Sequence, residues 1–314
     1  MIDFRYHLIS IVAVLLALGI GVLMGSAVLD DQLLSGLRTE VDDLRRRNGE
    51  LRAQVDGLSD GLEGAEAFAL AAEPRLTDGA LFGEQIVLIE FEGTSGNLIE
   101  NVRDSVSEAD GQVASTVNIT DKFALSDRSE RDELALILRS TLTGGAELRA
   151  QAGQVLGERV AAVAGTSPRS PRGSTSTRLL DSLVNELEEA DFIGVDRQSE
   201  GVTIPTGATV LMLGGDDLSP PFELQGFLLE MTTTLADQGV GILVAEPLTS
   251  QWNLVAAIRE DGQATNEVAT VDQVDTAAGR VAVVLGLELV ENDVAGHYGV
   301  RAGATEVIPE PSPT

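Results

Sequence analysis

The sequence contains no cysteine and only two histidines, His7 and His297, among its 314 residues. The lack of cysteine excludes disulfide bonds, thiol catalysis, zinc fingers and cysteine-ligated metal clusters. A Ser-His-Asp catalytic centre or a histidine-rich metal site would have to depend on those two histidines. These two shortages exclude many common catalytic and metal-binding classes before any motif is considered.

Basic residues are also scarce. Lysine and arginine together number 21, against 50 aspartates and glutamates, so the formal net charge is −29, and Lys122 is the single lysine. This charge opposes binding to nucleic acid or to an anionic lipid surface, because both require basic residues. Hydrophobic residues make up 43% of the chain, which is enough for a buried core in one large or two ordinary domains.

One segment near the amino terminus is long and uncharged. Residues 8–29 carry no charged side chain, and as a helix they would be about 33 Å long, close to a hydrocarbon core of about 30 Å. We expect an uncleaved transmembrane helix; the alternative is a secretory signal cleaved near Gly25-Ser26-Ala27. Arg5 precedes the segment and Asp30 follows it, so the positive-inside rule places residues 1–7 in the cytoplasm and the rest outside.

A heptad repeat follows the apolar segment, within residues 30–72. Leucine occupies the d positions and mostly valine or leucine the a positions, and the series comprises Leu34, Leu37, Val41, Leu44, Asn48, Leu51, Val55, Leu58 and Leu62. Leucine at d with β-branched residues at a favours two parallel strands, and a buried Asn48 pair would fix their register. We therefore expect a dimeric coiled-coil stalk. The alternative is one long helix packed on its own globular domain.

Two glycines in the apolar segment, Gly21 and Gly25, have the spacing that lets membrane helices approach closely. Gly25 lies nine residues before Leu34, so in one straight helix the glycine face points away from the heptad seam. We hypothesise that these glycines pack on a different membrane partner. The alternative is that they reflect the general frequency of glycine in membrane helices.

The pattern after Pro74 is typical of an α/β domain. Short apolar runs, such as residues 85–91 and 209–213, alternate with helical patterns, which indicates a parallel sheet covered by helices on both faces. We predict a Rossmann-like or flavodoxin-like fold. The expected segments are a linker at 73–84, an extracytoplasmic domain at 85–308 with a loop at 165–177, and a disordered tail at 309–314.

Individual elements follow from the same patterns. The expected strands are 85–91, 113–119, 209–213, 241–245 and 267–271. The expected helices are 97–109, 128–142, 146–163, 178–190, 220–238, 252–260 and 273–287. His297 and Tyr298 lie between two glycines, which predicts a turn at that point.

Several places have residue types suited to chemistry. Gly93–Gly96 follows a strand and opens a helix, whose amides could hold a phosphate. Gly214–Asp217 follows another strand, and there Asp216 and Asp217 could bind a hard cation. Glu90 and Glu92 alternate on one face of a strand end, as acid–base carboxylates would. A metal-ligand role for His297 is the alternative to a structural one. Turns, helix caps and a structural histidine explain all of these more simply, so we predict neither an enzyme nor a catalytic residue.

The apolar segment also carries a specific pattern, H-x-x-S-(I/L)-x-A-V-x-L-A-L-x-I-G-x-x-x-G. Its residues are His7, Ser10, Ala13, Val14, Leu16, Ala17, Leu18, Ile20, Gly21 and Gly25. Together with the stalk, the α/β domain and the late Gly296–Gly299 stretch, it resembles the actinobacterial MctB-type copper transporter family. That family includes the corynebacterial cell-envelope protein SteB, and the resemblance covers the whole architecture.

The resemblance implies an envelope protein connected with copper homeostasis or with cell separation at the septum, where SteB acts with a membrane partner, SteA. Cu(I) favours thiolate and thioether ligands, and Cu(II) favours imidazole. This chain has no cysteine, and its methionines are Met1, Met24, Met212 and Met231. The residues therefore predict no metal site and no cofactor, and copper enters through the resemblance alone.

Our leading hypothesis from the sequence is a non-enzymatic, single-pass membrane protein that dimerises through its stalk and organises envelope or septal partners. A second membrane protein of the SteA type is one expected partner, and nucleic acid is not. The alternative is a copper transporter or efflux component. A third hypothesis is a sensor that binds a small ligand at the strand ends near Gly93 and Gly214.

Overall fold

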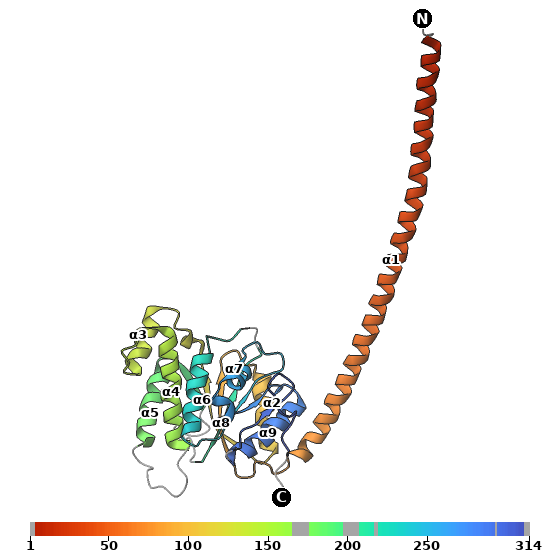
Figure 1. Cartoon of the computed structure of the whole chain (residues 1–314). Helices are drawn as coiled ribbons and strands as arrows, with labels where there is room; N and C mark the ends of the chain where they lie inside the picture. The colour runs from red at the N-terminus through yellow and green to blue at the C-terminus, as the bar shows by residue number, and fades with distance from the viewer. Residues whose placement is uncertain (1–3, 165–175, 197–206, 217–218, 293, 311–314) are drawn as a thin grey trace. The chain divides into compact units, whose positions relative to one another are not determined.

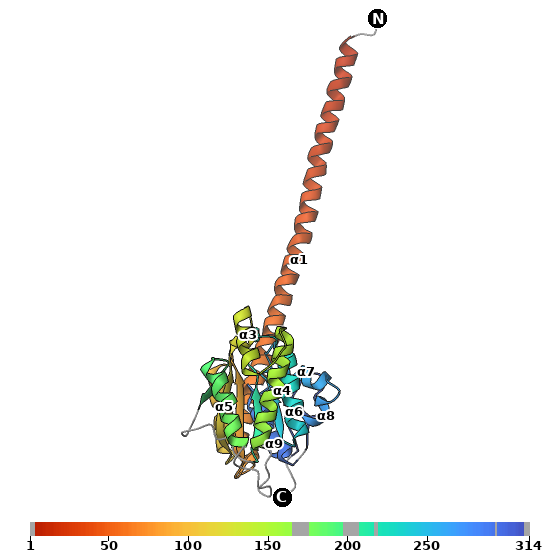
Figure 2. The same cartoon turned by 90° about the vertical axis from the view of Figure 1, so that its left-hand side faces the viewer.

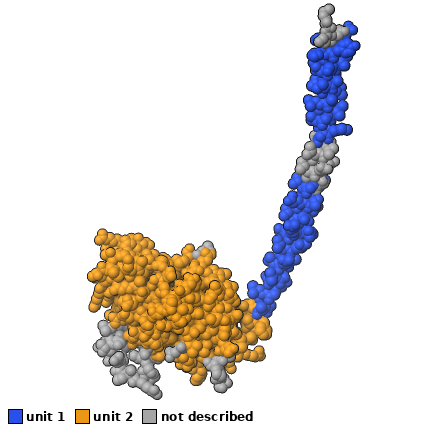
Figure 3. All heavy atoms as spheres, in the orientation of Figure 1, with its two compact units in different colours: residues 1–65 blue, residues 66–314 orange. Residues whose placement is uncertain are grey.

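The computed structural model of the chain describes residues 4–164, 176–196, 207–216, 219–292 and 294–310. For residues 26–35, 163, 176–181 and 196 it describes the backbone alone. Met1, the side chain of Leu34, Asp217, most of the expected loop at 165–177 and the last part of the expected tail therefore lie outside the description. The chain divides into two compact units, residues 1–65 and 66–314 (Figure 3).

A single helix, α1 (Phe4–Leu76), contains both the apolar segment and the heptad repeat. Its first part, Phe4–Gly25, is long and apolar enough to cross a membrane. Within the repeat, Arg46 pairs with Asp43 at 3.0 Å and with Glu50 at 3.2 Å, contacts of the kind that support an exposed helix by a few tenths of a kcal/mol, roughly. The helix ends at Leu76 and contains Pro74, which has no N–H to donate to the carbonyl of residue 70.

The globular unit is built around a seven-stranded sheet in the order β3-β2-β1-β4-β5-β6-β7. The strands are β1 (Gln85–Phe91), β2 (Gln112–Ile119), β3 (Ile193–Asp196), β4 (Thr209–Leu213), β5 (Ile242–Ala245), β6 (Ala269–Val271) and β7 (His297–Tyr298). All neighbours are parallel except β3, which runs antiparallel to β2. The predicted parallel-sheet α/β domain is therefore confirmed, with β3 and β7 as additional edge strands.

Helices cover both faces of this sheet (Figure 1). They are α2 (Gly96–Glu108), the short 3-10 helix η1 (Asp121–Ala124), α3 (Arg128–Ile137), α4 (Gly145–Ala164), α5 (Ser176–Glu189), α6 (Gln225–Asp237), α7 (Leu254–Glu260), α8 (Ala264–Glu267) and α9 (Ala277–Glu291). Helices α4, α5, α6 and α7 pack on one face, and α2 and α9 on the other. Figure 2 shows the first of these layers in front of the sheet.

Alternation along the strands explains the two cores. On β1, Val87, Ile89 and Phe91 point to the α4–α6 side, whereas Ile86 and Leu88 point to the α2–α9 side. All five of these side chains are buried. Both faces of each central strand must be apolar in such a three-layer arrangement, which is why these strands read as continuous apolar runs in the sequence.

Several predicted boundaries differ from the structure. Helix α3 ends at Ile137 rather than at residue 142, because Arg139 adopts a left-handed backbone conformation with φ of 52°. Helices α6, α7 and α9 begin later than predicted, at Gln225, Leu254 and Ala277. The prediction of a turn at His297 is wrong: His297 and Tyr298 form β7, whose pairing with β6 extends the sheet.

Candidate functional site

The carboxyl ends of the central parallel strands lie at one edge of the sheet, which is where open α/β sheets bind ligands. The strand order reverses between β1 and β4, because β2 lies to one side of β1 and β5 lies beyond β4 on the other. The loops that follow β1, β4, β5 and β6 meet at this edge. Most candidate residues from the sequence belong to these loops.

The two glycine-rich turns predicted separately come together here. The backbone N–H of Ser95, which caps α2, donates to Oδ1 of Asp216 at 3.0 Å. A Cβ on Gly215 would lie 2.8 Å from the carbonyl oxygen of Gly93 and 2.4 Å from the ring of Trp252, so only glycine allows this approach. An amide at the start of α2 thus donates its hydrogen bond to a carboxylate of the chain itself, at the place where the sequence suggests a phosphate site.

A surface hollow of about 270 Å³ lies at the same point. Its lining residues are Ser95, Asn97, Leu98, Asn101, Asp216, Pro247, Thr249 and Asp275. Two of these are carboxylates and none is basic, so the hollow repels an anionic ligand. The phosphate-binding interpretation of the Gly93–Gly96 turn therefore loses its electrostatic basis.

Glu90 and Glu92 bind separate partners. Oε1 of Glu90 accepts a hydrogen bond from Nδ2 of Asn118 at 3.3 Å. Oε2 of Glu92 accepts one from the backbone N–H of Asp121 at 2.7 Å. Each carboxylate thus ties β1 to β2 or to the start of η1, which is a structural role for both residues.

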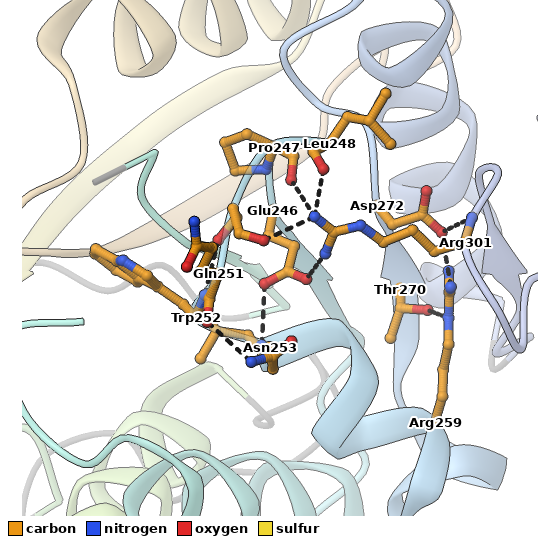
Figure 4. Close-up of polar contacts among 12 residues, drawn as sticks. Glu246, Pro247, Leu248, Gln251, Trp252, Asn253, Arg259, Thr270, Asp272 and Arg301 are labelled. Carbon is orange, nitrogen blue, oxygen red and sulfur yellow. Dashed lines mark hydrogen bonds and ion pairs between the residues drawn. The ribbon is translucent and has the colours of Figure 1, made fainter. Parts of the chain in front are cut away.

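The most deeply buried charges of the edge lie beyond β4. Glu246 directly follows β5 and Asp272 directly follows β6, and both residues are 0% exposed. Nη1 of Arg301 lies 2.6 Å from Oε1 of Glu246, and Nη1 of Arg259 lies 2.7 Å from Oδ2 of Asp272 (Figure 4). A buried carboxylate requires such a partner, because desolvation of an unpaired charge is very costly.

Both arginines also donate to backbone carbonyls. Arg259 donates from Nε to the Thr270 hydroxyl at 2.9 Å and from Nη2 to the carbonyl of Tyr298 at 2.9 Å. Nη2 of Arg301 donates to the carbonyls of Pro247, Leu248 and Ser250. The donors of each guanidinium are therefore largely used within the chain.

The same network fixes the segment at residues 300 and 301 to the sheet. The backbone N–H groups of Val300 and Arg301 donate to the two oxygens of Asp272 at 2.8 and 3.1 Å. Glu246 in turn accepts from the N–H of Leu254 at 2.9 Å, at the start of α7. Burial raises the pKa of Glu246, and the nearby Arg301 opposes that shift. The chain thus supplies its own cation at the edge where other α/β proteins bind ligands.

His297 is held by threonines. Its Nδ1 lies 2.9 Å from the hydroxyl of Thr270, and its Nε2 lies 3.0 Å from both the carbonyl and the hydroxyl of Thr265. Burial lowers the pKa of this histidine. Nδ1 therefore contacts β6 and Nε2 contacts α8, so both ring nitrogens are engaged, which favours the structural explanation over metal ligation.

The other candidate copper ligands are dispersed. Met212 and Met231 are buried in the core on the α4–α6 side of the sheet, and Met24 lies in the apolar segment of α1. Within the described parts of the chain, histidine, aspartate and glutamate form no group of three or more that could hold a metal ion.

The predicted stalk residues form an exposed apolar series on α1. The described members in the a and d positions are all exposed, namely Leu37, Val41, Leu44, Asn48, Leu51, Val55, Leu58 and Leu62. The side chain of Leu34 lies outside the described residues. A Cβ on Gly21 or on Gly25 would meet nothing within 4 Å, so this face of the apolar segment is open as well.

The fold and the site define an α/β protein that has an N-terminal helix suited to a membrane and closes the carboxyl edge of its sheet with its own ion pairs. In comparisons with known proteins, residues 1–309 match the family described as "Copper transport outer membrane protein, MctB". The chain therefore belongs to the MctB family, as the pattern in its amino-terminal segment predicts.

Individual relatives match over nearly their whole length. The chain is 32% identical over 318 residues to "Copper transporter MctB" of Mycobacterium tuberculosis, which covers 98% of this chain and 99% of that protein. It is 30% identical over 319 residues to "Copper transporter MctB" of Mycobacterium leprae, with the same coverage. These matches favour the copper alternative from the sequence over the septal scaffold as a description of the family.

Proposed function

We propose that this chain serves the copper transport for which its relatives are named, as a membrane-anchored, non-enzymatic component that organises other envelope proteins. The observation that carries the proposal is the match of residues 1–309 to a single family whose curated relatives are named copper transporters. In this proposal copper is the cargo of the assembly that the chain serves, and other proteins of that assembly bind it.

The positions of the candidate ligands support the proposal that copper is bound by other proteins and not by this chain. His297 uses both ring nitrogens on threonines, and Met212 and Met231 are buried among apolar side chains. Glu246 and Asp272 are each neutralised by an arginine. A copper ion would have to displace these partners, which would leave buried polar groups unsatisfied.

The exposed heptad series supports pairing as the means of assembly. Leu51 and Leu58 are 60% and 75% exposed in the single chain, and a second parallel helix would cover them by knobs-into-holes packing. We propose that two copies pair along residues 30–62 and that both apolar segments enter one membrane. In the proposed topology the amino terminus is cytoplasmic and residues 66–314 are outside.

The copper part is tested in the organism that encodes the chain. A deletion strain should tolerate less copper than its parent, and expression of the wild-type chain should restore tolerance. Unchanged tolerance together with defective cell separation would reject copper transport and favour the septal role. Native mass spectrometry of the full chain in detergent, with and without copper, addresses metal binding; a defined copper stoichiometry would contradict the organising role.

The pairing part is tested by Leu51→Asp, which places a charge at a d position. We expect the full chain in detergent to change from dimer to monomer, because a buried unpaired carboxylate strongly opposes association. Ala53→Asp is the matched control, since residue 53 lies at the outward f position of the same turn. Analytical ultracentrifugation gives the oligomeric state, and equal behaviour of the two variants would contradict the predicted seam.

A further inference from the structure

Phe68 is a large apolar residue at an unusual place in the heptad frame. It is 76% exposed, and the frame of Leu37, Leu44, Leu51 and Leu58 assigns residue 68 to a g position. Positions of type g flank the seam of a coiled coil and usually carry charged residues. An exposed phenylalanine at g therefore indicates an apolar surface that this single chain leaves uncovered.

The other flank of the same segment is covered by the chain itself. Residues 66–76 belong to the globular unit, and Glu66 and Glu73 occupy its e positions. Glu66 accepts a hydrogen bond from the N–H of Ala277 at 2.7 Å, at the start of α9. Glu73 is 5% exposed; it accepts from the hydroxyl of Ser105 in α2 at 2.7 Å and pairs with Arg280 of α9 at 3.1 Å. The e flank is thus embedded between α2 and α9.

The geometry of a parallel pair connects these two flanks. In a two-stranded parallel coil, a g residue of one helix faces the e residue of the next heptad on the other helix. Residue 68 of one copy therefore faces residue 73 of the second copy, and residue 73 is embedded in its own globular unit. The neighbour of Phe68 in such a pair is a globular surface rather than solvent.

We propose that Phe68 of each copy packs on the globular unit of the second copy, beside that copy's Glu73 and helices α2 and α9. The contact rests on the stalk pairing proposed above, and it extends the interface from the stalk to the globular units. By symmetry it occurs twice in each dimer, so two phenylalanine rings are covered.

The seam residues of this segment are small enough to let the two helices approach closely. The a and d positions at 69 and 72 are both alanine, and small side chains at a helix contact shorten the distance between helix axes. A bulky residue on the flank then fills the space beside the narrowed seam. Ala69 and Ala72 are already half-buried in the single chain, and the second helix would complete their burial.

The test uses the full chain in detergent and exploits its lack of cysteine. Leu51→Cys reports stalk pairing through a disulfide between copies. In the same protein, a photoreactive benzoylphenylalanine replaces Phe68, and after irradiation under reducing conditions the covalent dimers are mapped by mass spectrometry. We expect covalent dimers whose cross-links lie in α2 or α9. Benzoylphenylalanine at Ala67, an exposed f position, should give none.

The outcomes separate this contact from the pairing it rests on. Disulfide-linked dimers without photo-cross-links at 68, or with cross-links to α1 of the second copy alone, would overturn the contact and leave the stalk pairing intact. Failure of Leu51→Cys to form a disulfide would overturn both. As a second measure, Phe68→Ala should raise the dimer dissociation constant by at least about tenfold. Leu70→Ala, at the exposed b position, should leave it unchanged.

Discussion

Leucine side chains have very different surroundings in helix α1 and in the globular unit. Leu44 and Leu58 on α1 are 60% and 75% exposed, whereas Leu211 at the centre of β4 is 1% exposed. The sheet finds cover for its side chains within the same chain, from the helices on its two faces. The exposed apolar series on α1 can be covered only by a surface outside its own unit. Composition is therefore a poor guide to burial here, and the arrangement decides it.

Glycines show the same contrast. A Cβ on Gly57 of α1 would meet nothing within 4 Å, whereas a Cβ on Gly153 would lie 2.2 Å from the carbonyl oxygen of Phe227, where α4 crosses α6. Glycine is required for the crossing in the globular unit, whereas at residue 57 it merely weakens helix α1.

The strongest effect is expected where buried charges close the globular unit. Asp272→Ala leaves the guanidinium of Arg259, whose side chain is 4% exposed, without its carboxylate. We expect the free energy of unfolding of this unit to fall by about 3–5 kcal/mol. Urea unfolding of the full chain, followed by the fluorescence of the single tryptophan, Trp252, measures this. Asp78→Ala, at an exposed residue, is the control, and an equal loss in both variants would contradict the buried-pair argument.

Substituting alanine for glycine should have opposite signs in the two regions. Gly153→Ala forces α4 away from α6 and should lower the stability of the globular unit by about 1–3 kcal/mol. Gly57→Ala should stabilise α1 by up to about 1 kcal/mol. Trp252 fluorescence reports the first change, and the helical circular dichroism signal during melting reports the second. A loss of stability in both variants would mean that Gly57 is also in a close contact.

The smallest effect concerns pH. Burial, and then the neighbouring carboxyl of Glu291, raise the pKa of Glu84 from 4.5 to about 7. The folded chain therefore binds an extra proton between about pH 4.5 and 7, so this group's contribution to stability decreases as pH rises through that range. Glu84→Gln should remove that slope from the pH profile of the urea midpoint. Parallel profiles for the two proteins would show that Glu84 titrates normally.

The main architecture could be predicted from the sequence because its signals are local. Apolar runs such as 85–91 and 209–213 are buried on both faces and alternate with helical patterns, which is sufficient to predict a parallel sheet. Strand β3 lacks this signal: its four residues Ile193–Asp196 include a glycine and an aspartate, and it pairs antiparallel at the edge. The short strand β7 is specified by its pairing with β6, which no local pattern encodes.

The carboxyl edge could be predicted only in part. The turns at Gly93–Gly96 and Gly214–Asp217 are predictable because glycine after a strand is a local signal. The sequence does not predict the two buried ion pairs, because no helical or strand spacing relates Arg259 to Asp272, 13 residues away, or Arg301 to Glu246, 55 residues away. One usable signal existed: Glu246 and Asp272 each directly follow an apolar strand, and an acid there needs a partner when the edge is closed.

The bonds of Arg301 have a consequence for the order in which the chain is made. Glu246 is 0% exposed, yet its cationic partner is translated 55 residues later. Until Arg301 leaves the ribosome, the edge beyond β5 has a carboxylate that cannot be buried without a large penalty. The globular unit can therefore reach its final form only after residue 301 has been made, well after the amino-terminal apolar segment has become available to a membrane.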